Sequence, residues 1–313
     1  MLDVLQYENI DELNKINLQI LSIVKDFSTI EIANAVMTRF NPLKEFNLIA
    51  EKYLAPIEPL INVEQVNNWC KNKTHGKINK ILDRLEPYTL MILLNAVYFK
   101  GEWEKKFFED HTNKLPFYNL GKEEIKVDTM TQIGFFYYYE EKKYQAIQLN
   151  FMEDYISAII ILPQEGTDIN KFINSLSISS EEYNKIINKL EYSRVLIQLP
   201  KFELTLTENL NEILKDLGMY NAFSDDTADF TGLKEEKEIY INSVNHKTYL
   251  KISEDGCEAA AITEIDMEKI SSMYEEEEKI YNMKVNRPFL FLLKNSELPK
   301  EHNLIFMSKI EEL

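Results

Sequence analysis

"YTLMILLNAVYFKG", residues 88–101, is a nearly unbroken apolar segment that begins after Pro87 and ends at Gly101. Between Leu90 and Phe99 its one amide or charged side chain is Asn95. Continuous apolar runs of this kind are typical of strands buried on both faces, which lie near the centre of a sheet. A buried amide without a partner costs about 1–3 kcal/mol. We therefore expect Asn95 to meet a polar group from a neighbouring strand.

Helical and strand patterns alternate on both sides of this segment without regular βαβ order. Helices are predicted over 10–27, 43–54, 62–82, 180–190 and 208–218, the last with Thr207 as its N-cap and Gly218 at its end. Further strands are predicted over 31–40, 144–151, 155–162, 195–206, 239–253, 288–294 and 303–309. This mixture favours an α+β fold with large, mostly antiparallel sheets in one domain.

The charge balance makes several classes of partner unfavourable. Lys and Arg number 35 against 52 Asp and Glu, so the formal net charge is −17. This disfavours nucleic acid, membrane surfaces and heparin-like polyanions. No apolar stretch is long enough to cross a membrane. The amino-terminal residues carry no signal-peptide pattern, which predicts a cytoplasmic protein as written, or an extracellular one if the natural chain begins earlier.

The reactive residue types do not form a catalytic or metal-binding pattern. The two cysteines, Cys70 and Cys257, lie far apart, and the four histidines show no metal-ligand spacing. The sequence also lacks the Gly-x-Ser-x-Gly motif of hydrolases. We therefore expect no enzyme activity, no metal and no cofactor.

The segment "EDGCEAAAITEIDMEK", residues 254–269, alternates with a period of two. The odd-numbered residues from Cys257 to Met267 are small or apolar, apart from the hydroxyl of Thr263, whereas carboxylates predominate among the even-numbered ones. This pattern indicates a strand with one buried face. Twelve residues would span roughly 40 Å, longer than most strands. We therefore interpret this segment as a loop that can become a strand.

Six stretches occur in a recognisable order: "NNWCKNKTHGKI" (67–78), "LLNAVYFKGEWEKKF" (93–107), "IQLPKFEL" (197–204), "LKDLGMYNAFSDDTADFTGL" (214–233), "SVNHKTYLKISEDGCEAAAIT" (243–263) and "NRPFLFLLKN" (286–295). Together they resemble the signatures of the serpins, the family of suicide-type protease inhibitors. The resemblance implies an α+β fold with a large, mixed, mostly antiparallel central sheet, further sheets, surrounding helices and an exposed reactive loop near the carboxyl end.

The resemblance also assigns residues to the opening of the central sheet. It places Asn95 and His246 in the shutter, where two central strands part, with His246 structural rather than a general base. It places Trp103, Lys201 and Glu254 in the breach, where the loop enters the sheet. The serpin pattern begins with two to three helices, whereas this sequence opens at what matches the end of the third. A single serpin-like domain over 1–313 without the family's first helices is therefore expected, with a reactive loop at about 254–285.

The implied function is inhibition of a target protease, serine proteases being favoured over papain-like cysteine proteases, by a monomeric chain. The protease would form an acyl-enzyme with the loop, and the cleaved segment 254–270 would insert into the central sheet. The hinge for this step comprises Glu254, Gly256, Cys257, Glu258, Ala259, Ala260, Ala261, Ile262 and Thr263. The binding-class alternative is a non-inhibitory serpin-fold carrier or an inactive truncated copy.

The position of the scissile bond stays open between several residues. Counting seventeen residues from Glu254, the usual family spacing, puts the cut at Ile270–Ser271 and suggests an elastase-like target. Counting back from Pro288 indicates a loop about seven residues longer than the common pattern. Lys269 would suit a trypsin-like protease, and Met273 or Tyr274 a chymotrypsin-like one.

Overall fold

The computed structural model describes residues 2–5, 7–25, 30–120, 124–152, 155–176, 180–235, 239–256 and 279–313. The chain divides into two compact units, each assembled from two stretches of sequence. The first unit comprises Met1–Phe99 and Leu204–Leu250, and the second comprises Lys100–Glu203 and Lys251–Leu313. The expectation of one domain over 1–313 stays a prediction.

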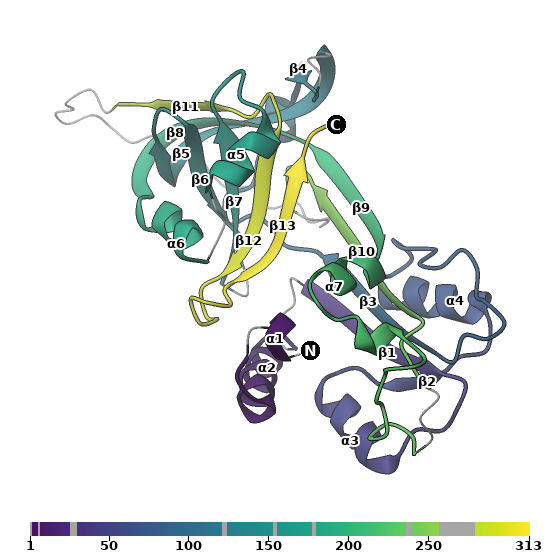
Figure 1. The fold of residues 1–313 in the computed structure, drawn as a ribbon. Helices are drawn as coiled ribbons and strands as arrows, with labels where there is room; N and C mark the ends of the chain where they lie inside the picture. Colours follow the sequence, from purple (N-terminus) through teal and green to yellow (C-terminus); the bar gives the residue numbers. More distant parts are fainter. Residues whose placement is uncertain are drawn as a thin grey trace. The chain divides into compact units, whose positions relative to one another are not determined.

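The first unit is built on a five-stranded sheet with the order β2-β1-β3-β10-β9 (Figure 1). Its strands are β1 (Ile30–Thr38), β2 (Ile57–Pro59), β3 (Met91–Phe99), β9 (Phe202–Asn209) and β10 (Ser243–Ile252). β1 pairs antiparallel with β3, and β3 pairs parallel with β10. The helices of this unit are α1 (Leu2–Leu5), α2 (Ile10–Val24), α3 (Lys44–Lys52), α4 (Val63–Lys73), α7 (Asn211–Asp216) and the 3₁₀ turn η2 (Asn221–Phe223).

The two faces of this sheet have different cover. On one face, Ala35, Leu94, Ala96 and Tyr249 belong to a core cluster that includes Val66 and Cys70 of α4. On the other face, Val36, Leu93 and Val244 pack against a second cluster, formed by Met91, Ala222, Leu233, Ile239 and Ile241. Because side chains alternate along a strand, Asn34, Asn95 and His246 share this second face.

The second unit contains a larger sheet with the order β11-β8-β5-β6-β7-β12-β13, with β4 paired to β5. Its strands are β4 (Asn113–Tyr118), β5 (Glu124–Glu140), β6 (Tyr144–Asn150), β7 (Ile156–Pro163), β8 (Glu191–Pro200), β11 (Tyr281–Lys284), β12 (Phe289–Asn295) and β13 (Leu304–Ile310). The helices α5 (Ile169–Leu176) and α6 (Ser180–Asn188) pack on β6, β7 and β12 through Phe172 and Tyr183, and η1 (Glu109–His111) is a short 3₁₀ turn.

The α+β class and the mixed sheets are confirmed by these two sheets. The apolar run of residues 88–101 forms β3 at the centre of the first sheet, as predicted. The predicted strands over 144–151, 155–162, 288–294 and 303–309 appear as β6, β7, β12 and β13 with small shifts of their ends. The sequence did not predict β4, β5, β11 or α5.

Two predicted elements differ from the observed ones in their extent or continuity. The helix expected over 62–82 ends at Lys73, because His75 and Gly76 adopt positive φ angles of 49° and 78°, which no α-helix contains. The strand expected over 195–206 is two strands, β8 and β9, which are interrupted at Lys201.

The predicted cap of the helix over 208–218 is also wrong. Thr207 lies within β9, and α7 begins after Leu210, whose side chain makes no capping hydrogen bond. Gly218, with φ 107°, follows the end of the helix as predicted.

Candidate functional site

The chain reverses direction directly after β10. Ser253 N donates to Gly256 O at 2.8 Å, and Gly256 N donates to Ser253 O at 3.1 Å, so Glu254 and Asp255 form a tight turn. Gly256 also forms an antiparallel bridge with Glu102. Its φ is 123°, and a Cβ at this position would lie 2.1 Å from Gly101 O. Only glycine fits both the backbone angle and this close approach.

Trp103 holds the turn from the side. Its indole Nε1 donates to Ser253 O at 3.0 Å, and its backbone N donates to Asp255 O at 2.8 Å. The ring is 1% exposed and stacks on Phe151 with centroids 4.3 Å apart. Phe107 N adds a hydrogen bond to Glu254 O at 3.0 Å. Every carbonyl from Ser253 to Asp255 therefore has a donor from the segment 103–107.

Glu254 is a buried carboxylate with two side-chain partners. Its residue is 7% exposed, Lys201 Nζ lies 2.8 Å from Oε2, and Thr112 Oγ1 donates to Oε1 at 2.7 Å. Burial by itself would raise the pKa of Glu254, but the hydrogen bonds from Lys201 and Thr112 outweigh it and hold the pKa below its usual value. Glu254 is thus ionised at neutral pH.

Lys106 adds a more exposed ionic link across the same turn. Its Nζ lies 2.8 Å from Glu102 Oε2 and 3.4 Å from Asp255 Oδ1. The hydrogen bond to Glu102 raises the pKa of Lys106, against a smaller opposite effect of burial. Lys106 therefore links Glu102, the bridge partner of Gly256, to Asp255 in the turn.

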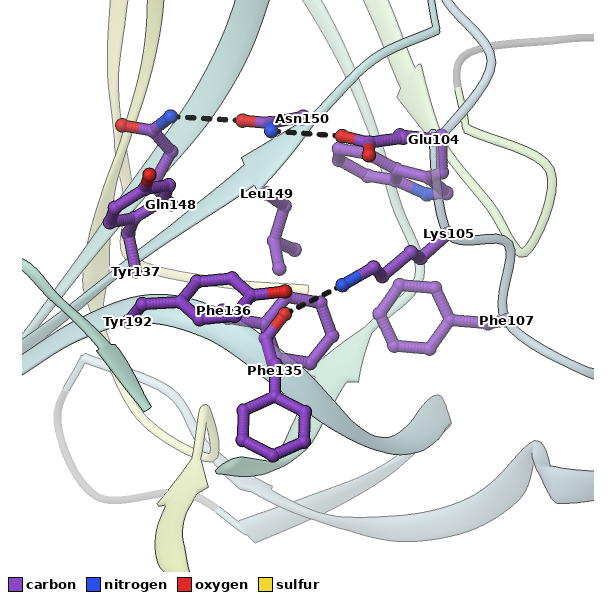
Figure 2. Close-up of a pocket in the computed structure, with 11 residues that line it drawn as sticks. Glu104, Lys105, Phe107, Phe135, Phe136, Tyr137, Gln148, Leu149, Asn150 and Tyr192 are labelled. Carbon is purple, nitrogen blue, oxygen red and sulfur yellow. Dashed lines mark hydrogen bonds between the residues drawn. The ribbon is translucent and has the colours of Figure 1, made fainter. Parts of the chain in front are cut away.

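A cavity of about 60 Å³ lies beside Trp103 in the second unit (Figure 2). Lys105 points across it and donates to Phe135 O at 2.8 Å, and its ammonium lies 5.3 Å from the ring centroid of Phe136. Tyr192 stacks on Phe135 at the rim. The cavity has room for only a few water molecules.

In the first unit, a chain of polar side chains crosses three adjacent strands. Asn34 of β1, Asn95 of β3 and His246 of β10 are direct register partners. Asn95 Nδ2 donates to Asn34 Oδ1 at 2.7 Å, His246 Nδ1 lies 2.6 Å from Asn95 Oδ1, and Thr248 Oγ1 lies 2.8 Å from His246 Nε2. The carbonyl of Asn95 can only accept, so His246 carries its proton on Nδ1 and accepts from Thr248.

Burial lowers the pKa of His246, and the charge of Glu208 opposes this in part. The folded protein thus favours the neutral ring, while the unfolded chain protonates near pH 6.5. Stability from this group is full above that pH and is lost as the pH falls through it toward the folded pKa. We expect the melting temperature of the natural chain to drop more between pH 7.5 and 5.5 than that of the His246→Gln variant, measured by calorimetry. An equal drop in both would contradict a neutral, buried His246.

The structure brings together the residues predicted for the shutter, Asn95 with His246, and those predicted for the breach, Trp103 with the Lys201–Glu254 pair. Their functional roles stay predictions. Gly256 lies next to the breach residues. The remaining hinge and reactive-bond residues, Cys257, Glu258, Ala259, Ala260, Ala261, Ile262, Thr263, Lys269, Ile270, Ser271, Met273 and Tyr274, lie outside the described residues.

Sequence reasoning missed Asn34, Thr112, Lys106 and Thr248. Asn34 had a detectable signal, since it is an amide inside the apolar strand "IEIANAVMT", as Asn95 is in β3. Thr112 and Lys106 follow no apolar pattern, so only the fold reveals them. Within the described ranges, no group of three or more His, Cys, Asp or Glu side chains could hold a metal ion, and no helix is long and apolar enough to cross a membrane.

Comparison with known proteins identifies the family of this chain. The family model described as serpin (serine protease inhibitor) matches residues 1–313. Intracellular coagulation inhibitor 2 of Tachypleus tridentatus is 32% identical over 89% of this chain and 68% of its own length. Iripin-2 of Ixodes ricinus is 30% identical over 91% of this chain and 72% of its own.

The solved native structure of the thermophilic serpin tengpin has a TM-score of 0.85 and 29% identity, covering 97% of this chain and 79% of that one. The match thus extends over nearly all of this chain in both sequence and fold, and this chain belongs to the serpin family.

Proposed function

We propose that this chain is a protease inhibitor that acts as a suicide substrate. A target protease, serine rather than cysteine in type, would attack the segment after Gly256. With Ile270–Ser271 as the cut, the protease hydroxyl attacks the Ile270 carbonyl carbon and the peptide bond to Ser271 breaks. The hydroxyl proton passes to the new amino group, and an ester joins Ile270 to the protease. Insertion of residues 254–270 into the first-unit sheet would then trap this ester.

The proposal is supported above all by the double pairing of Gly256. Gly256 bridges antiparallel to Ser253, which follows β10 in the chain, and to Glu102, which follows β3. β3 and β10 are themselves parallel and directly paired, from Ile92–Ser243 to Tyr98–Tyr249. A strand that turns back after β10 would run antiparallel to both. One rung of such a strand therefore already exists at Gly256.

The register supports the same path. The offset of 151 residues between Asn95 and His246 also separates Glu102 from Ser253. A strand that continues from Gly256, one residue per rung, would place Thr263 opposite both Asn95 and His246. Its hydroxyl could then join the polar chain when the two strands part, so His246 would not lose all its partners.

In the same register, Glu258 and Ala259 would each lie between side chains that suit them. Glu258 would lie between Lys100 and Lys251, and Ala259 between Phe99 and Leu250. Opposite charges across a ladder are stabilising, and the small methyl of Ala259 fits between two side chains that are buried in the closed sheet. Each further rung adds ladder hydrogen bonds and buries apolar surface.

The deciding experiment is incubation of the full chain with trypsin-, chymotrypsin-, elastase- and cathepsin-type proteases, followed by denaturing gels. A band at the summed mass of chain and protease is expected with one of them, and mass spectrometry of the released peptide identifies the cut among Lys269, Ile270, Met273 and Tyr274. The nicked chain should also melt at a higher temperature than the intact one, because it gains a strand. Cleavage by all four without a covalent band would reject inhibition and support the non-inhibitory carrier.

A further inference from the structure

One face of β5 and β8 in the second unit exposes a group of large apolar and aromatic side chains around an arginine. This group, which we call the β5–β8 patch, consists of Ile133, Phe135 and Tyr137 of β5 and Tyr192, Arg194 and Leu196 of β8. The strand register pairs its members directly across the two strands. Tyr137 and Tyr192 are 45% and 60% exposed, whereas the sequence neighbours Phe136 and Val195 are buried. Contiguous exposed apolar surface of this kind is typical of interaction sites.

The aromatic rings of the patch hold one another in place. Phe135 stacks on Tyr192 with ring centroids 5.6 Å apart, and the ring centroid of Tyr137 lies 5.4 Å from that of Tyr192 (Figure 2). Lys105 Nζ donates to Phe135 O at 2.8 Å and lies 5.7 Å from the ring centroid of Tyr192. Rings that are already ordered lose little side-chain entropy when a partner covers them, so they are well suited to carry binding energy.

The patch differs in charge from the chain as a whole. The chain carries a net charge of −17, but the residues of β5 and β8 that share this face, from 131 to 137 and from 192 to 198, include no Asp or Glu. Arg194 lies opposite Phe135, and no carboxylate among the described residues pairs with its guanidinium. Lys105 adds a second cation at the rim. A partner segment with a carboxylate beside apolar side chains would match both the charge and the rings.

The proposed reactive segment ends beside the patch. β11, which follows that segment, pairs parallel with β8. Lys279 Nζ lies 3.5 Å from Glu140 Oε1 at the end of β5, so the chain leaves the segment next to the same two strands. With the cut at Ile270–Ser271, nine residues separate Ile270 from Lys279, which is a tether of at most ~30 Å. This length is about the diameter of a small domain, so a protease bound at the cut lies within reach of the patch.

We propose that the β5–β8 patch is an accessory docking surface for the target protease, which contacts it through a surface segment that carries a carboxylate beside apolar side chains. The carboxylate pairs with Arg194, and the apolar side chains cover Tyr137 and Tyr192. This inference rests on the proposed function, because the reactive segment brings the protease to the patch. It goes further by assigning part of the choice of protease to residues outside the segment that is cut.

The test measures docking without chemistry. Trypsin-, chymotrypsin- and elastase-type proteases whose active serine is replaced by alanine cannot cleave the full chain, and surface plasmon resonance gives their Kd for it. At least one should bind the natural chain, and it should bind Tyr192→Ala and Arg194→Glu at least about tenfold more weakly. Tyr220→Ala and Arg84→Glu change the same residue types at exposed positions of the first unit and should alter the Kd by about twofold or less.

Circular dichroism and the melting temperature verify that all four variants fold. Kd values that the two patch variants leave unchanged, or no binding by any of the three proteases, would overturn the proposal. Sedimentation tests the other occupant: a dimer of the natural chain that Tyr192→Ala dissociates would assign the patch to a second copy of the chain instead. Docking of an inactive protease needs no acyl-enzyme, so it is measurable even if no covalent band forms, and a covalent band with unchanged Kd values would reject the patch alone.

Discussion

On the proposed mechanism, exchanging Glu258 and Ala259 is expected to convert the chain from an inhibitor into a simple substrate of a target protease. The double change Glu258→Ala with Ala259→Glu keeps composition and net charge but moves one carboxylate by one residue. In the register that continues from Gly256, the carboxylate would then face Phe99 and Leu250, which are 3% and 1% exposed in the closed sheet. Burying an unpaired carboxylate costs several kcal/mol, of which every ~1.4 kcal/mol changes a rate or equilibrium by about tenfold.

The measurement is the ratio of covalent complex to cleaved chain on a denaturing gel, which should fall by at least tenfold. Glu258→Ala alone is the control, since it removes the carboxylate from a position between Lys100 and Lys251 and should change the ratio by about twofold or less. A double variant that forms as much complex as the control would contradict insertion in this register.

Replacing Gly256 by alanine should give the largest loss of stability among substitutions in the turn Ser253–Gly256. The new Cβ would lie 2.1 Å from Gly101 O and 2.8 Å from Trp103 N, and both are backbone atoms that cannot move aside cheaply. The φ of 123° adds strain of about 1–3 kcal/mol for a residue other than glycine. The turn must therefore open, which removes the bridge to Glu102 and weakens the contacts of Ser253 with Trp103. We expect a melting temperature several degrees lower, measured by calorimetry.

Gly166→Ala separates backbone strain from steric overlap. Gly166 also has a positive φ, of 77°, but an added Cβ meets no heavy atom within 4 Å. Its substitution should lower the melting temperature distinctly less than that of Gly256. If the two variants lost equal stability, the close approach of Gly256 to Gly101 would have no energetic consequence.

The elements that the sequence predicted well are those whose pattern is local. β3, β7 and β12 are continuous apolar segments, and such a run by itself indicates a buried strand. β5 was missed because its burial changes along its length: its first half alternates, whereas its second half is the aromatic run Phe135–Tyr139 with mixed exposure. α4 was extended too far because an apolar spacing continues beyond Lys73, although backbone angles at His75 and Gly76 end the helix.

The candidate site divides in the same way. A buried amide in β3 implied that a polar partner exists, and the resemblance to serpins named His246 as that partner. The other two members of this row of polar side chains, Asn34 and Thr248, could be identified only from the strand register and the contacts in the structure. In the turn after β10, the partner of Glu254 is Thr112, which lies 142 residues away in the sequence. Thr112 lies in an irregular segment, so no periodic pattern in the sequence predicts this contact.

The family resemblance, the central strand and the two-residue alternation of the loop segment could all be identified from the sequence alone, because motif order and side-chain polarity are local properties of the chain. The tertiary structure was needed to show that Gly256 pairs on both sides at once, and that Asn34, Asn95, His246 and Thr248 form one row of hydrogen-bonded side chains across three strands. Both depend on which distant backbones come within hydrogen-bond distance, and that is a property of strand order and register rather than of any single segment.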